Sequence, residues 1–144
     1  MAHPDVSGLD ADEAARVQSE LNEARAILLH AERRANVLLS LLNGPGKEHD
    51  KSLPAGFLAQ MMETREAIEA AMADAAARSQ WVNWAEQQRE HYNARVSPLF
   101  ARAIGGDVSV LASIRRELNA WRYIERLVEQ LEPGYDPSKA DFRS

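Results

Sequence analysis

The stretch LASIRRELNAWRYIERLVEQL, residues 111–131, decides the fold of this chain. Its apolar side chains recur at steps of three and four residues, the spacing that places them on one face of an α-helix. That face carries Leu111, Ile114, Leu118, Trp121, Ile124, Val128 and Leu131. A continuous apolar face of this kind predicts a core helix, with Trp121 buried between neighbouring helices.

Two further long helices are predicted before this stretch. The first covers about residues 55–73 and the second about residues 74–104, where Gly105-Gly106 breaks the helical pattern. Pro98 is expected to kink the second helix or to end its regular part. The side chains expected to face inward from it are those of Trp81, Trp84, Ala85, Tyr92, Val96 and Leu99. Short connections between long amphipathic helices favour an antiparallel three-helix bundle, so the fold class is all-α.

The N-terminal part of the chain predicts one long and one short helix. Asp10 with Glu13 three residues later is typical of a helix start. One apolar stripe follows, made of Ala14, Val17, Leu21, Ala24 and Leu28. A short helix is expected over about residues 32–42, and Asn43-Gly44-Pro45-Gly46 should end it, because proline cannot continue a helix.

Residues 44–54 are the best candidate for a boundary between two parts of the chain. They are polar, carry charges of both signs and contain two prolines. We therefore expect an N-terminal region over residues 1–43, a linker over 44–54, a helical bundle over 55–132 and a loose polar tail over 133–144.

Composition restricts the classes of function. The chain of 144 residues has no cysteine, which rules out disulfides and cysteine ligation of zinc or of an iron–sulfur cluster. A net charge of −5 argues against non-specific binding of nucleic acid. The N-terminus lacks a basic-then-apolar leader and no apolar run is long enough to cross a bilayer, so we expect a cytoplasmic protein without a membrane partner.

Chemistry-bearing motifs are scarce. The four histidines are scattered and none follows a glutamate at the spacing of a di-iron bundle, so neither a metal site nor a cofactor is expected. Gly-rich phosphate loops and hydrolase motifs are also missing. The arginines that could bind an anion are expected to form a solvated helix face; they are Arg115, Arg116, Arg122 and Arg126.

The segment FLAQMMETRE, residues 57–66, begins a helix with two apolar stripes. One contains Phe57 and Met61, and continues through Ile68 to Met72. The other contains Leu58 and Met62, with Glu63 and Glu66 beside it. The residues alone leave two interpretations open: an ordinary core helix with both stripes buried, or a helix whose second stripe is a binding surface.

Several segments in order resemble the HscB family, the J-type co-chaperones of iron–sulfur cluster assembly. These segments are His3-Pro4-Asp5, LNEA at 21–24, RANVLL at 34–39, FLAQMMETRE at 57–66 and the stretch from Leu118 to Leu131. The resemblance runs from His3 to about residue 132. It implies that residues 1–43 are a partial J domain and that residues 55–132 are the C-terminal three-helix bundle of the family.

The resemblance also implies partners and contact residues. His3, Pro4 and Asp5 would contact a DnaK-type (seventy-kilodalton heat-shock) chaperone. An IscU-type scaffold protein would dock on residues that match the family pattern, namely Leu58, Met62, Glu63, Arg65, Glu66 and Tyr123. Ala59 departs from the pattern, because the family carries a larger apolar residue there, and Arg25 departs because J domains favour an aromatic residue. In a J domain, helices precede the His-Pro-Asp loop and hold it rigid. Here only Met1 and Ala2 precede His3, so weak stimulation of the chaperone ATPase is expected.

The function expected on these grounds is binding, not catalysis: a co-chaperone or adaptor that couples the scaffold to the chaperone. Two alternatives stay open. The first is a stand-alone helical module for protein interaction, including weak self-association. The second is a small all-α enzyme, which would require Arg115, Arg122 or Arg126 to converge with a carboxylate in a cleft.

Overall fold

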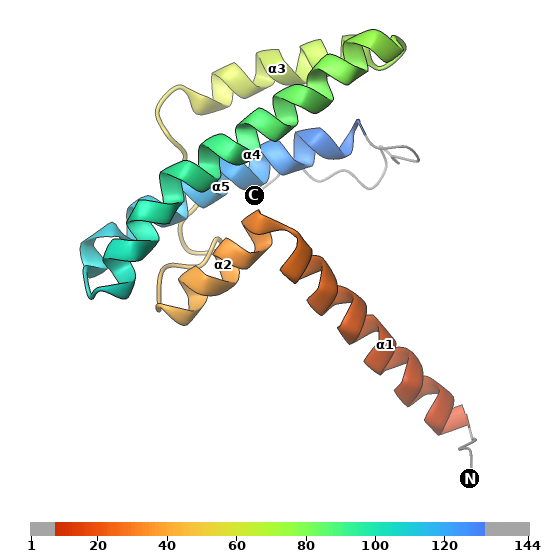
Figure 1. The fold of residues 1–144 in the computed structure, drawn as a ribbon, viewed down its shortest axis with the longest axis vertical. Helices are drawn as coiled ribbons and strands as arrows, with labels where there is room; N and C mark the ends of the chain where they lie inside the picture. Colours follow the sequence, from red (N-terminus) through yellow and green to blue (C-terminus); the bar gives the residue numbers. More distant parts are fainter. Residues whose placement is uncertain (1–7, 132–144) are drawn as a thin grey trace. The chain divides into compact units, whose positions relative to one another are not determined.

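The computed structural model describes the backbone of residues 8–131, and the side chains of this range except those of residues 8–9 and 23–29. Every regular element of this range is helical, which confirms the all-α fold (Figure 1). The elements are α1 (Gly8–Leu29), α2 (Ala31–Leu41), α3 (Phe57–Ala71), α4 (Ala75–Ile104), the 3-10 helix η1 (Val108–Val110) and α5 (Leu111–Glu129). None of the helices within residues 8–131 is long and apolar enough to cross a membrane.

The chain divides into two compact units, Met1–Arg34 and Ala35–Ser144. In the first unit, α1 exposes every side chain described between Asp10 and Asn22. Arg16 forms ion pairs with Glu13 and with Glu20, 2.8 Å away, along this helix. The expected apolar stripe is therefore uncovered at Ala14, Val17 and Leu21, and its continuation lies outside the described side chains. The expected boundary at residues 44–54 stays a prediction.

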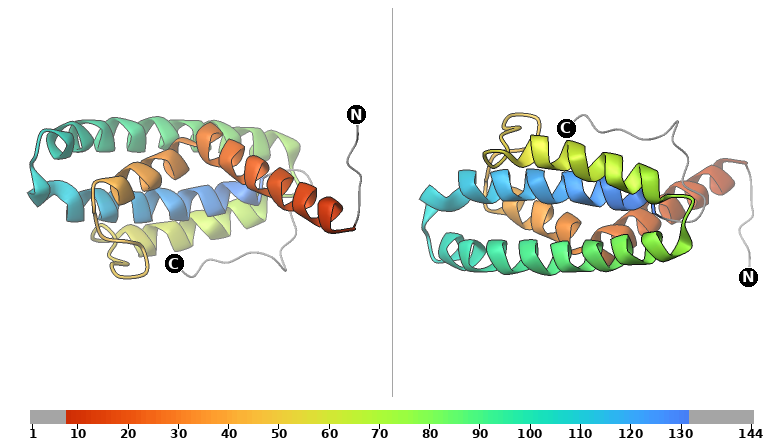
Figure 2. Two further views of the ribbon diagram at one scale, coloured as in Figure 1. Left: turned by 90° about the horizontal axis from the view of Figure 1, so that it is seen from below. Right: turned by 90° about the horizontal axis from the view of Figure 1, so that it is seen from above.

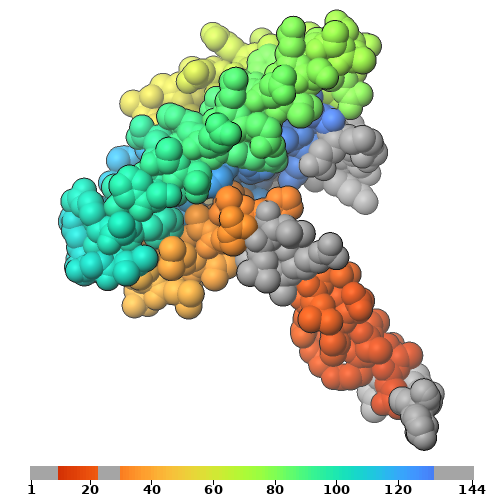
Figure 3. Space-filling view, viewed as in Figure 1, coloured from red at the N-terminus to blue at the C-terminus, as the bar shows by residue number. Residues whose placement is uncertain are grey.

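The second unit contains the helical bundle. Helices α3 and α5 run in one direction and α4 runs in the opposite one, as the two views of Figure 2 show. Helix α4 packs on both of the others, and the surfaces of α3 and α4 adjoin in Figure 3. The up-down-up order agrees with the predicted antiparallel bundle.

The bundle core is built on α5, as its apolar face predicts. Ile114, Leu118 and Ile124 are fully buried, and Trp121 is 1% exposed. The indole of Trp121 stacks on Tyr92 of α4, with ring centroids 6.1 Å apart. Burial raises the pKa of Tyr92 to about 12, because the tyrosinate would lose hydration there. Leu127, which lies outside the predicted face, is also fully buried.

Two of the three tryptophans correct the sequence analysis. Trp81 and Trp84 of α4 are only partly buried, although both were expected to anchor the core. They contact each other edge to face, with ring centroids 5.3 Å apart. A tryptophan is large enough to touch the core and still keep part of its ring in water.

The helix ends follow local chemistry. The carboxylate of Asp74 accepts a hydrogen bond from the Ala76 N–H at 3.0 Å and caps α4. Asp107 does the same for the Ser109 N–H, also at 3.0 Å, before η1. Helix α3 starts at Phe57 instead of residue 55, because Gly56 adopts a left-handed φ of 75°. Helix α4 continues through Pro98, so of the two outcomes expected at this proline its regular part does not end there, and the kink stays a prediction.

Candidate functional site

Helix α3 has one buried and one exposed apolar stripe. The buried stripe contains Phe57, Met61 and Ile68, which are 6%, 4% and 0% exposed. Leu58 and Met62, one helical turn apart, are 50% and 58% exposed. The two interpretations of this helix are thereby distinguished: the second stripe lies on the surface of the bundle, not in its core. We call Leu58, Met62, Glu63, Arg65 and Glu66 the outer face of α3; Arg65 is partly buried and the other four are exposed.

The charged residues of the outer face are mostly acidic. Glu63 and Glu66 are exposed. Arg65 donates from Nε to the Glu69 carboxylate at 3.1 Å, one turn further along the helix. Because Glu69 offsets the charge of Arg65, the outer face combines an apolar pair with a net negative rim. This combination suits a protein partner that offers apolar side chains and positive charge.

Tyr123 of α5 meets α3 at its first turn. Its half-buried ring contacts the ring of Phe57 edge to face, with centroids 5.8 Å apart and an interplanar angle of 87°. Since Phe57 directly precedes Leu58, the contact brings Tyr123 to the end of α3 that carries Leu58. Five of the six expected scaffold-binding residues therefore share α3, and the sixth reaches the same helix from α5.

The expected chaperone-binding residues His3, Pro4 and Asp5 lie outside the described residues, as does the side chain of Arg25. Among the described residues, no group of three or more histidine, aspartate or glutamate side chains is placed to hold a metal ion.

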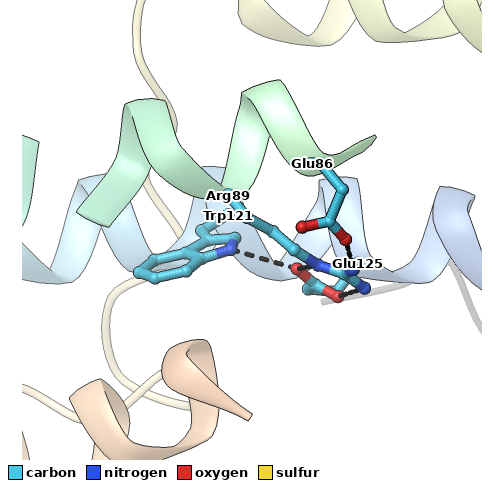
Figure 4. Close-up of polar contacts among 4 residues, drawn as sticks. All are labelled: Glu86, Arg89, Trp121 and Glu125. Carbon is cyan, nitrogen blue, oxygen red and sulfur yellow. Dashed lines mark hydrogen bonds and ion pairs between the residues drawn. The ribbon is translucent and has the colours of Figure 1, made fainter. Parts of the chain in front are cut away.

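A polar cluster of four residues joins α4 to α5 (Figure 4). Arg89 donates from Nε and a terminal nitrogen to the two oxygens of Glu125, at 2.9 and 2.8 Å. The Trp121 Nε1–H donates to Glu125 at 3.1 Å, and Arg89 also donates to Glu86 at 2.6 Å. The hydrogen bonds to Glu125 raise the pKa of Arg89 above its ordinary value. Every group of this cluster is bound to a neighbour, which is typical of an interhelical contact.

Arg115 corrects the expectation of a solvated arginine face. It is 4% exposed and donates to amide and carbonyl oxygens of α2, α5 and the segment between α2 and α3. Arg116 is exposed, whereas Arg122 and Arg126 are partly buried. Since Arg115 is used in holding the chain together, the arrangement gives no support to an enzyme with Arg115 in a catalytic cleft.

Two sets of long-range side-chain contacts escaped sequence reasoning. One is the pair Arg89–Glu125, whose members are separated by 36 residues. The other is the pair Arg115 and Asn119, which contact residues 67–79 positions earlier in the chain. For Arg115 and Asn119, the only local signal was the i, i+4 spacing on α5, which many solvated helices share.

Comparison with known families gives a match over the C-terminal part of the chain. Residues 53–132 match the family model of the HSCB C-terminal oligomerisation domain. The match covers more than half of the chain and includes α3, α4 and α5, hence the whole outer face of α3 and Tyr123. No curated protein and no solved structure matches the chain.

Proposed function

This chain belongs to the HscB family through its C-terminal oligomerisation domain, and on that premise we propose that its bundle binds an IscU-type iron–sulfur scaffold through the outer face of α3. The family is one of co-chaperones, so the proposed role is binding and not catalysis. The single observation that carries the proposal is the exposure of Leu58 and Met62, at 50% and 58%, on a helix whose other apolar stripe is buried.

The energetics favour a docking surface here. Fully burying a large aliphatic side chain contributes about 1.5–3 kcal/mol, so a partner that covers Leu58 and Met62 gains affinity from both. Tyr123 adds a rigid ring whose position is fixed by Phe57. The exposed Glu63 and Glu66 would accelerate encounter with a positively charged scaffold surface. Ala59, also exposed, contributes little area, which lowers the expected affinity.

The second part of the proposal concerns the chaperone. We expect His3, Pro4 and Asp5 to contact a DnaK-type chaperone and to couple the bound scaffold to its ATPase with weak stimulation. The resemblance of the N-terminal segments to a J domain supports this part, and the family as a whole works with chaperone partners.

The test of the docking surface is the double variant Leu58→Ala with Met62→Ala. Affinity for an IscU-type scaffold, measured by isothermal titration calorimetry, should fall at least tenfold, which corresponds to about 1.4 kcal/mol. Far-UV circular dichroism should stay unchanged, because neither side chain is part of the core.

The bundle offers a matched control for this variant. Ile104 and Val108, beside the turn between α4 and α5, are 65% and 73% exposed and lie far along the chain from α3. Replacing both with alanine removes a similar apolar area and should leave scaffold affinity unchanged. Equal losses in both double variants, or unfolding of the Leu58/Met62 variant, would contradict the proposal.

Self-association is the second candidate function, and the description of the matching family as an oligomerisation domain favours it. The same two double variants separate the candidates. Sedimentation velocity of the wild type should show a concentration-dependent dimer if the bundle self-associates, and the variant that abolishes the dimer identifies the surface used.

A further inference from the structure

Three side chains of α5 lie in one line along the helix. Arg115, Asn119 and Tyr123 are spaced four residues apart, so they project from successive turns of nearly the same face. Each of them contacts a different part of the chain between α2 and the first turn of α3. We refer to residues 42–56, which join α2 to α3, as the connector.

The first contact of the line reaches α2 and the start of the connector. Arg115 donates to the Asn36 side-chain oxygen at 2.6 Å and, over a longer 3.5 Å, to the Pro45 carbonyl. Its Nε donates to the Asn119 side-chain oxygen at 3.0 Å. Because the Asn119 oxygen accepts this last hydrogen bond, the Asn119 amide nitrogen faces the next part of the connector.

The second contact holds the middle of the connector. The Asn119 amide nitrogen donates to the carbonyl oxygens of Asp50 and Ser52, both at 2.9 Å. These carbonyls flank a tight turn, in which Ser52 donates its N–H and its hydroxyl to the Asp50 carboxylate at 3.0 and 2.5 Å. The same hydrogen bonds lower the pKa of Asp50 below its ordinary value. A single amide group therefore fixes both sides of the turn.

The third contact lies where the connector ends. Tyr123 packs edge to face on Phe57, the first residue of α3, and the Phe57 N–H donates to the Pro54 carbonyl at 3.1 Å. Along α5 the contacts thus follow the order of the chain, from Asn36 through residues 45, 50 and 52 to Phe57. Because successive parts of the connector bind successive turns of α5, the connector crosses the bundle along one path. The first turn of α3 therefore lies at one position.

We propose that this line of side chains is a strap that orders the connector and the first turn of α3, with Asn119 as its positioning residue. The consequence for binding rests on the proposed function. If the outer face of α3 binds a scaffold, an ordered first turn holds Leu58 in place beforehand. Binding then loses less conformational entropy, which is how preorganisation raises affinity.

The central variant of the test is Asn119→Asp. A carboxylate keeps the acceptor for the Arg115 Nε–H and has nearly the same shape, but it cannot donate to the two connector carbonyls. Asn119→Gln, which keeps the two donors, is the rescue variant. Asn83→Asp, on an exposed position of α4, adds the same charge away from the strap and serves as the control.

Hydrogen–deuterium exchange of the free protein is the first measurement. In Asn119→Asp, amides of residues 50–60 should exchange at least fivefold faster, and amides of α4 and α5 should keep their wild-type rates. Asn119→Gln should recover part of the protection, and Asn83→Asp should have no effect. Unchanged exchange over residues 50–60 overturns the strap, and so does an equal acceleration throughout the bundle.

A second variant and a second measurement complete the test. Ser52→Ala removes the hydroxyl that binds Asp50 and should accelerate exchange over the same residues to a smaller extent.

Affinity for an IscU-type scaffold should fall about threefold in Asn119→Asp. Faster exchange with unchanged affinity overturns the link between the strap and binding. A wild type that does not bind the scaffold contradicts the proposed function, and the exchange rates then decide the strap alone.

Discussion

At the scale of single residues, Trp121 is a central side chain of the bundle core. It is 1% exposed, stacks on Tyr92 and donates to Glu125, so it joins the apolar core to the Arg89 cluster. Trp121→Ala should lower the free energy of unfolding by about 3–5 kcal/mol, the range typical of truncating a buried large aromatic residue. Urea denaturation followed by circular dichroism measures it. Stability close to wild type would mean that the core repacks around the missing ring.

Sequence periodicity located the residues of the core unevenly. It placed Trp121 correctly, because seven apolar residues at helical spacing leave little choice of face. It omitted Leu127 of α5. It also overestimated the burial of Trp81 and Trp84, because α4 is long and its inward face is not defined by its own sequence. Which part of a long helix is covered depends on where its partners end. That information is carried by the other helices.

At the scale of elements, the carboxylate of Asp107, which caps η1, makes the bundle sensitive to acid. Hydrogen bonds from Ser109, and then from Arg102, hold the pKa of Asp107 below its ordinary value. A lowered pKa in the folded state means that the ionised form stabilises folding. That contribution is complete above the ordinary aspartate pKa of about 4 and is lost as the pH falls through the lower folded pKa.

The prediction for this element compares Asp107→Asn with the wild type across pH. The variant should have a lower thermal midpoint at neutral pH, because a neutral amide is a weaker partner for Arg102 and the Ser109 N–H. The difference should shrink as the pH falls below about 4, where the carboxylate of the unfolded chain takes up a proton, and it should be lost as the pH falls through the lower pKa of the folded state. Differential scanning fluorimetry at a series of pH values is the measurement. A difference that stays constant from neutral pH to pH 2 would contradict this account.

Helices were easier to predict than the connector between α2 and α3. Proline, glycine and mixed charges in residues 44–54 predict a linker, and local sequence contains nothing that says where its polar groups bind. The partners are Arg115 and Asn119, which follow more than 60 residues later. Gly44 shows the same limitation: a Cβ there would lie 2.2 Å from the Leu39 side chain, a close approach that sequence does not reveal.

At the scale of the whole molecule, the candidate site combines what sequence and structure each contribute. The resemblance named Leu58, Met62 and Tyr123 for docking, but the pattern of α3 alone allowed a fully buried helix. The exposed fractions remove that ambiguity for Leu58 and Met62, because neither is covered by the bundle. The scaffold itself stays a prediction, since no property of these side chains specifies one protein partner among those with apolar and basic surfaces.

The last prediction concerns how much of the chain the bundle requires. The family match begins at residue 53, whereas the compact unit begins at Ala35 and includes most of α2 and the whole connector. Leu39 of α2 is 1% exposed, and burying a leucine contributes about 1.5–3 kcal/mol. Arg115 would also lose its bond to Asn36 if α2 were removed.

A fragment of residues 35–144 should therefore unfold cooperatively, and a fragment of residues 53–144 should be less stable than it by at least about 2 kcal/mol. Guanidinium denaturation of both fragments measures the difference. Because the shorter fragment exposes Arg115 and the surface under Leu39, it should also bind a hydrophobic dye more strongly. Equal stability of the two fragments would show that α2 and the connector lie on the bundle without contributing to its folding, and the natural boundary would then be at residue 53.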